Sequence, residues 1–147
     1  MVLNIRTMAD YLAKGEMPEY LFWVGCAGSF DDRQKKVTRA FCEILQKAEI
    51  SYAVLGTEES CTGDPARRSG NEFLYQILSR ENIDTFNEVF ANRDVSKGNK
   101  KIVVTCPHCF TTIGRDYAQS GFELEMLHHT QLLNQLLREK RLLPIKM

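Results

Sequence analysis

The stretch Lys101-Ile-Val-Val-Thr-Cys106-Pro-His-Cys109-Phe110 decides the fold, because an apolar, β-branched run leads directly into a Cys-x-x-Cys motif. Such a run is typical of a buried strand in a parallel sheet. Pro107 suits the first turn of a helix, where its missing N–H is not needed. The pattern therefore places Cys106 at the end of a strand and Cys109 in the first turn of a helix. We expect the positive end of that helix to lower the pKa of both thiols and so to favour the thiolate.

Three further strands are predicted from similar patterns. Residues 20–26 and 50–56 are apolar runs, and residues 122–128 alternate apolar and polar as an edge strand does. Helical segments lie between and after them, in the order β-α-β-α-β-α-β-α. This order predicts an α/β fold with an open, mainly parallel four-stranded sheet and helices on both faces, of the Rossmann or flavodoxin type.

The helices are predicted from apolar stripes and from residues that favour helix starts. Asp31 and Asp32 favour the start of the first long helix. Its buried stripe is expected to be Val37, Ala40, Phe41, Ile44, Leu45 and Ala48. Asp64 and Pro65 are expected to cap and begin the next helix. Its buried face is expected to be Phe73, Leu74, Ile77 and Leu78.

Length and charge exclude several classes of function. The chain of 147 residues is the size of one domain, and its 19 basic and 19 acidic residues leave no basic field to attract nucleic acid. No run approaches the roughly 20 apolar residues that a membrane span needs, and the first residues lack the regions of a signal peptide. We therefore expect a cytoplasmic protein, with residues 1–19 a leader or short helix and residues 20–147 a single cysteine-rich domain.

The cysteines point to metal or redox chemistry. Their number, five, is odd, and in a reducing cytosol cysteines are more often metal ligands or redox groups than structural bridges. Cys26 and Cys61 follow two of the predicted strands, as Cys106 does a third. Because sites of open parallel sheets form outside the carboxyl ends of the strands, we expect these three and Cys109 to share one site.

Three kinds of chemistry fit these four residues. Four thiolates can hold an iron–sulfur cluster, such as [4Fe–4S], or a structural Zn²⁺ ion. The third alternative is metal-free thiol–disulfide exchange by Cys106 and Cys109, which would leave Cys26 and Cys61 without a role. A chain purified in air is expected to lack the metal or to form a disulfide.

Other residues near the predicted site are weaker candidates. His128 or His129 is a candidate further ligand at the end of the last strand. His108 is expected to tune the neighbouring thiolates, and Arg67 or Arg68 to offset the negative charge of a thiolate-bound cluster. Two residues are assigned no role in the site: Trp23, expected in the core, and Cys42, expected off the apolar stripe of its helix.

Together these motifs resemble a cysteine-rich CCG domain of the kind found in the B-type subunit of heterodisulfide reductase. Similar domains occur in iron–sulfur subunits of glycolate oxidase, anaerobic glycerol-3-phosphate dehydrogenase and lactate-utilisation complexes. The family pattern is a cysteine, then Cys-Cys-Gly, then Cys-x-x-Cys. Here the matching residues are Cys26, Cys61-Thr-Gly63 and Cys106-Pro-His-Cys109, and the blocks around them and His128-His-Thr130 resemble the first-domain version.

The chain departs from the family pattern in three ways. Thr62 replaces the second cysteine of the pair, and an insertion around residues 92–98 lengthens the second gap. Family members usually carry two such domains, whereas this chain has one. The resemblance implies a fragment of a larger protein, a component of an oxidoreductase rather than an independent hydrolase or transferase. It would pass electrons between flavin or iron–sulfur partner subunits, and these partners could hold it at a membrane.

Overall fold

The computed structural model describes residues 5–56, 59–90, 101–122 and 124–145. They form one four-stranded sheet in the order β2-β1-β3-β4, in which every neighbouring pair of strands is parallel. The prediction of an open parallel α/β sheet is confirmed. Its strands are β1 (Tyr20–Trp23), β2 (Tyr52–Val54), β3 (Lys101–Val104) and β4 (Glu125–His128). The insertion around residues 92–98 lies outside the described residues.

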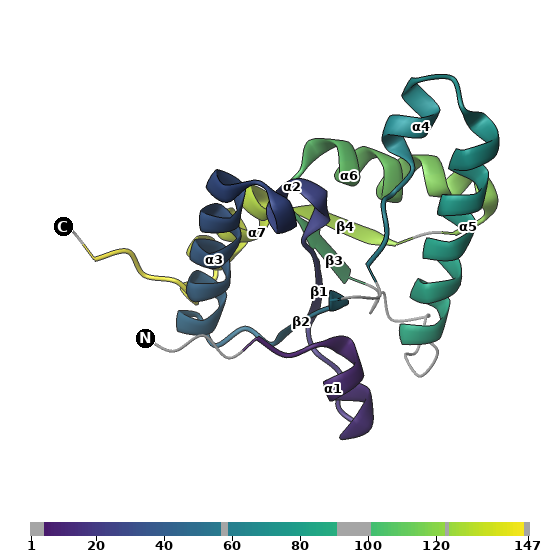
Figure 1. Ribbon diagram of the computed structural model, residues 1–147. Coiled ribbons are helices and arrows are strands. Elements are labelled where there is room, and N and C mark those ends of the chain that lie inside the picture. Colours follow the sequence, from purple (N-terminus) through teal and green to yellow (C-terminus); the bar gives the residue numbers. More distant parts are fainter. Residues whose placement is uncertain (1–4, 57–58, 91–100, 123, 146–147) are drawn as a thin grey trace.

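Helices connect the strands and cover both faces of the sheet (Figure 1). They are α1 (Met8–Ala13), α2 (Gly25–Phe30), α3 (Asp32–Lys47), α4 (Asp64–Arg68), α5 (Glu72–Val89), α6 (Pro107–Thr111) and α7 (His129–Arg138). Helix α6 runs on into a π-helical turn, η3 (Thr112–Asp116), and a 3₁₀ turn, η4 (Tyr117–Ser120). The predicted turn after β1 is therefore helical, and β1 ends three residues earlier than residue 26.

The two faces of the sheet carry separate hydrophobic cores, because successive strand residues point to opposite sides. On one face, Phe22 and Val103 pack against α3 and α7, with the Phe22 and Phe41 rings 5.2 Å apart. On the other face, Trp23 packs against Phe86 of α5, at a ring distance of 5.5 Å. All four strand residues of β1 are buried, and the prediction that Trp23 belongs to the core is confirmed.

The strand order places a topological switch point at β1. The connection from β1 to β2 uses α3 on one face, whereas the connection from β2 to β3 uses α4 and α5 on the other. The helices that follow β1 and β2 therefore lie on opposite faces of the sheet, and in such sheets ligands bind in the crevice at the carboxyl ends of the strands. The sequence indicated four strands but not this order.

The N-terminal segment packs on the sheet beside β2. The N–H of Val54 donates to the carbonyl of Arg6 at 3.1 Å, and the side chain of Met8 is fully buried in the core on the α5 face. Thr7 caps α1 and its hydroxyl accepts a hydrogen bond from the N–H of Asp10. These contacts hold residues 6–8 against the edge strand.

The predicted buried face of the helix after Cys61 is wrong. Phe73 is 78% exposed and Leu74 and Ile77 are each 41% exposed. Helix α5 instead buries Tyr75, Ser79, Asn82, Phe86 and Val89. The sequence pattern did not reveal this face because two of its residues, Ser79 and Asn82, are polar. Asn82 can be buried there because its hydrogen-bond partners lie on distant segments of the chain.

Two smaller expectations also fail. Cys42 is 1% exposed and belongs to the buried face of α3, whereas Val37 and Ala40, expected in the buried stripe, are exposed. The buried stripe of α3 is thus rotated towards Cys42. Gly63, in a left-handed conformation with φ +92°, occupies the N-cap position of α4 in place of Asp64.

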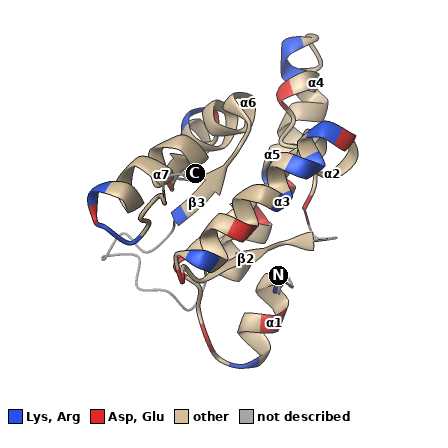
Figure 2. Cartoon of the chain, turned by 90° about the vertical axis from the view of Figure 1, so that its left-hand side faces the viewer, with Lys and Arg blue, Asp and Glu red and all other residues tan. Residues whose placement is uncertain are grey.

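The outer surface of α3 carries both signs of charge, as Figure 2 shows. Ion pairs join Lys35 to Asp32 and Arg39 to Glu43 within this helix. Among the described residues, none of the helices has both the length and the apolar character needed to cross a membrane.

Candidate metal centre

The turns after β1 and β3 bring three of the predicted cysteines to the switch point. Cys26 lies in the first turn of α2 and Cys106 is the N-cap residue of α6. Between these turns, a Cβ atom built on Gly25 would lie 3.6 Å from the Sγ atom of Cys109. The thiol of Cys109 therefore packs against the backbone that carries Cys26.

Glu59 holds the segment after β2 close to the turn after β1. Its carboxylate accepts hydrogen bonds from the N–H of Val24 at 3.0 Å and from the N–H of Gly25 at 2.6 Å. These N–H groups lie at the turn between β1 and α2, beyond the last residue of the strand. Glu59 thus ties the loop that carries Cys61 to the turn that carries Cys26.

Two buried side chains hold the other end of this loop. The amide of Asn82 donates to the carbonyl of Cys61 at 2.8 Å and to the hydroxyl of Tyr117 at 3.1 Å. The Tyr117 hydroxyl in turn donates to the carbonyl of Thr62 at 2.7 Å. The N–H of Gly63 donates to the Sγ atom of Cys61 at 3.4 Å.

The four cysteines differ in exposure. Cys26 and Cys61 are exposed, Cys106 is half-buried and Cys109 is buried, and all are free thiols. Within the described ranges, no three Cys, His, Asp or Glu side chains converge closely enough to hold a metal ion. What the structure brings together are the backbone turns, with the Cys109 thiol against the α2 turn and the side chains of Cys26 and Cys61 facing solvent.

The expected fall in thiol pKa does not hold for Cys109. Burial raises the pKa of its thiol well above the usual range, and the nearby groups Cys106, Cys26 and Glu59 raise it further. The positive end of a short helix is a weaker influence than the loss of water around the sulfur atom. The Cys109 thiol is therefore protonated at neutral pH.

This donor set suits a positively charged metal group. The neighbouring groups that raise the pKa of Cys109 are themselves thiols and a carboxylate. A cation bound among them would lower the pKa of this thiol and favour the thiolate. Sulfur ligands are preferred by iron–sulfur clusters and by zinc. The chemistry of these residues thus fits either group.

The histidines have local partners. His128 is the N-cap residue of α7, and its Nδ1 atom lies 2.9 Å from the hydroxyl of Thr130. The His129 ring packs edge-on against Phe41 of α3, and burial lowers the pKa of this imidazole. The Nδ1 atom of His108 lies 3.9 Å from the Sγ atom of Cys106, so this imidazole lies next to the first thiol of the motif.

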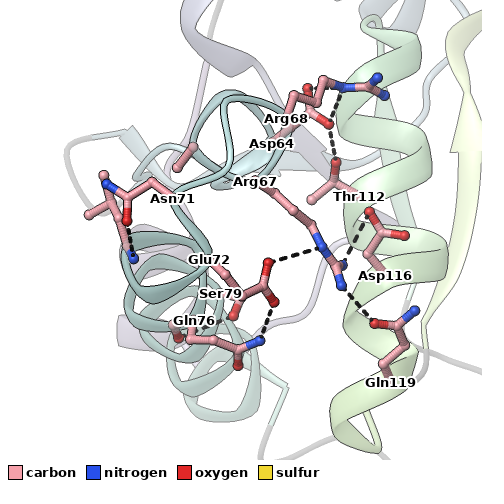
Figure 3. A network of polar contacts seen from close by, with 12 residues as sticks. Asp64, Arg67, Arg68, Asn71, Glu72, Gln76, Ser79, Thr112, Asp116 and Gln119 are labelled. Atoms are coloured by element: carbon pink, nitrogen blue, oxygen red, sulfur yellow. Dashed lines mark hydrogen bonds and ion pairs between the residues drawn. The ribbon is translucent and has the colours of Figure 1, made fainter.

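The two arginines form a structural network that Figure 3 shows. The Nε atom of Arg68 donates to both carboxylate oxygens of Asp64 at 2.8 and 3.0 Å, and the Thr112 hydroxyl also donates to Asp64 at 3.2 Å. Arg67 lies over the Tyr75 ring at 4.4 Å. It also pairs with Glu72, Asp116 and Gln119. These contacts join α4 to α5 and to the segment after α6.

Sequence reasoning missed three residues of the site. Glu59, Asn82 and Tyr117 hold the Cys61 loop, although none was singled out as a site residue. Their signal is indirect, since Asn82 stands at helical spacing among Tyr75, Ser79 and Phe86. A polar residue on a buried stripe could have been recognised only once the correct stripe was known.

The fold and the site together define a class of protein: an open parallel α/β domain with cysteine-bearing turns at its switch point. Comparison with known families gives the same result. Residues 20–114 match the model of the cysteine-rich domain called CCG. The chain belongs to this family, and the resemblance inferred from its motifs is confirmed.

Several curated relatives are similar over most of the chain. An EtfAB:quinone oxidoreductase of Syntrophomonas wolfei is 45% identical over 97% of the chain and 19% of the relative. A probable iron–sulfur-binding oxidoreductase FadF of Bacillus subtilis is 41% identical over 96% of the chain and 19% of the relative. The D-type subunit of the dihydromethanophenazine:CoB–CoM heterodisulfide reductase of Methanosarcina barkeri is 28% identical over 84% of the chain and 29% of the relative. The chain thus spans about a fifth of the length of the first two, and no solved structure matches it.

Proposed function

We propose that this chain is the iron–sulfur electron-transfer domain of an oxidoreductase, and that Cys26, Cys61, Cys106 and Cys109 hold a [4Fe–4S] cluster. The observation that carries the proposal is the packing of the Cys109 Sγ atom against the turn that carries Cys26. Relatives named as iron–sulfur-binding oxidoreductases support it. When bound, such a cluster accepts and releases single electrons.

The chain's own groups would prepare this site in three ways. Glu59 holds the Cys26 turn and the Cys61 loop together through its bonds to Val24 and Gly25. The Gly63 N–H donates to the Cys61 sulfur, and hydrogen bonds to ligating sulfur atoms raise the reduction potential of a cluster. The burial of Cys109 keeps water from one side of the site.

Structural zinc is the second candidate, because four thiolates are equally suitable ligands for Zn²⁺. Metal-free thiol–disulfide exchange by Cys106 and Cys109 is less favoured, because it would leave Cys26 and Cys61 without a role although Glu59 ties their two segments together. A role for His128 or His129 as an additional ligand stays a prediction, because four thiolates are enough to hold either a [4Fe–4S] cluster or Zn²⁺.

The test is anaerobic reconstitution with iron and sulfide, followed by iron and sulfide analysis, a visible spectrum and EPR of the reduced protein. Single replacements of Cys26, Cys61, Cys106 or Cys109 by serine are expected to abolish or alter the cluster signal. Cys42→Ala is the matched control, because Cys42 is buried on the inner side of α3, in the core on the opposite face of the sheet from Cys109. A wild-type chain with four free thiols that takes up no iron would contradict the proposal, and zinc in protein grown without added zinc would favour the alternative.

The larger setting is also a proposal. We infer that residues 20–147 act as one cysteine-rich domain and that the segment before residue 20 is an accessory packed on β2. The domain would work within a longer polypeptide, beside flavin or iron–sulfur partners that supply and remove the electrons. The names of relatives that act on quinones or heterodisulfides support this setting. We also propose a cytoplasmic location, with attachment to a membrane through partners.

A further inference from the structure

Residues 59–63 carry Cys61 and are fastened by two side chains from distant parts of the chain. Asn82 of α5 holds the carbonyl of Cys61, and Tyr117 of η4 holds the carbonyl of Thr62. We propose that Asn82 and Tyr117 are positioning residues, which fix the direction in which Cys61 presents its sulfur atom to a metal centre. The metal part of this inference rests on the proposed function, whereas the loop part rests on the contacts alone.

The Asn82 and Tyr117 side chains are both buried and use their polar groups to hold the loop. Asn82 is 1% exposed and Tyr117 is fully buried, so each requires hydrogen-bond partners inside the protein. Between described residues, the Asn82 amide N–H groups and the Tyr117 hydroxyl bond to one another and to the loop carbonyls. Burying these polar groups between α5 and the segment after α6 costs free energy unless they form hydrogen bonds, and the loop carbonyls accept such bonds.

These bonds determine how Cys61 is presented. The carbonyls of two successive residues are turned into the protein, which fixes the two peptide planes that follow Cys61. Gly63 continues the turn with φ +92°, and its N–H points to the Cys61 sulfur. The loop end is therefore held from inside, while the Cys61 side chain faces outward.

The first experiment uses the full chain without metal, under reducing conditions. Tyr117→Phe keeps the buried ring and removes only the hydroxyl, so the exchange of backbone amide hydrogens at residues 59–63 should quicken between about twofold and tenfold. Alkylation of Cys61, followed by mass spectrometry against Cys26 as an internal reference, should change with it. Tyr52→Phe is the matched control, because Tyr52 is also buried but lies in the core of the opposite face.

The second experiment uses the iron-loaded protein. Tyr117→Phe and Asn82→Leu are expected to shift the EPR spectrum of the reduced cluster or its reduction potential, whereas Tyr52→Phe should leave both unchanged. A purely structural role of Asn82 and Tyr117 would lower the thermal stability of Tyr117→Phe and Asn82→Leu without moving the spectrum of the protein that remains folded.

The outcomes separate the two proposals. Unchanged exchange at residues 59–63 in both Tyr117→Phe and Asn82→Leu would overturn the positioning inference, and so would loss of the folded state in both. Faster exchange with an unchanged cluster spectrum would overturn its metal part. A wild-type chain that binds no iron would overturn the proposed function, while the exchange data would still decide the role of the two side chains in the loop.

Discussion

Replacing Gly63 by alanine should destabilise the protein by about 2–5 kcal/mol. Gly63 has φ +92°, in the left-handed region, where a residue with a Cβ atom costs roughly 1–2 kcal/mol. An added Cβ atom would also lie 2.9 Å from the Cδ2 atom of the buried Tyr75 ring. Because this ring is 3% exposed and Arg67 lies over it, overpacking should add about 1–3 kcal/mol.

Gly70 offers a matched control for the two contributions. Its φ is +91°, and an added Cβ atom would meet nothing within 4 Å. Gly70→Ala should therefore cost only the backbone contribution, about 1–2 kcal/mol. The difference between the two variants isolates the contact with Tyr75.

Urea unfolding of the reduced, metal-free chain, followed by circular dichroism, measures both free energies of unfolding by linear extrapolation. Equal losses at Gly63 and Gly70 would refute the steric argument at Tyr75. A Gly63→Ala variant as stable as the wild type would refute the left-handed turn itself, and with it the geometry of the loop that carries Cys61.

Three further predictions concern the groups around the site. Burial raises the pKa of Glu59, so as pH rises the unfolded chain loses this proton before the folded protein does. The free energy of unfolding should therefore fall as pH rises towards and through the folded pKa. Glu59→Gln should reduce this fall when urea unfolding is compared at about pH 5 and about pH 8. Iodoacetamide should label the exposed Cys26 much faster than the buried Cys109 at neutral pH, and equal rates in mass spectrometry would contradict the packing of that thiol. Thr112→Val removes a buried hydroxyl bonded to a carboxylate of α4 and should cost about 1 kcal/mol in thermal unfolding, whereas Thr111→Val, at an exposed position next to it, should cost less than half as much.

The parallel sheet and the location of the cysteines were predictable because both depend on short-range pattern. The run before Cys106 is apolar and β-branched, and Pro107 indicates a helix start directly after it. Each signal lies within a few residues of the feature it predicts. The structure confirms the resulting α/β sheet, and the family comparison confirms the class.

The errors came from interactions between distant segments. Phe73 and Ile77 suggested the wrong face of α5, because the true face buries Asn82, whose partners lie on the Cys61 loop and at Tyr117. The pKa of Cys109 was misjudged for a similar reason: the helix start is visible in the sequence, whereas the burial that dominates it is not.

Local periodicity by itself thus determined the four strands, the long helices between them and the order in which cysteines follow strands, but not helix α2 or the buried faces of α3 and α5. Only the tertiary structure decided the strand order, which makes β1 the switch point, and the hold of Glu59, Asn82 and Tyr117 on the Cys61 loop. The physical reason is that propensity acts between neighbours in the chain. Burial and hydrogen-bond satisfaction, in contrast, depend on which distant segments meet in the folded protein.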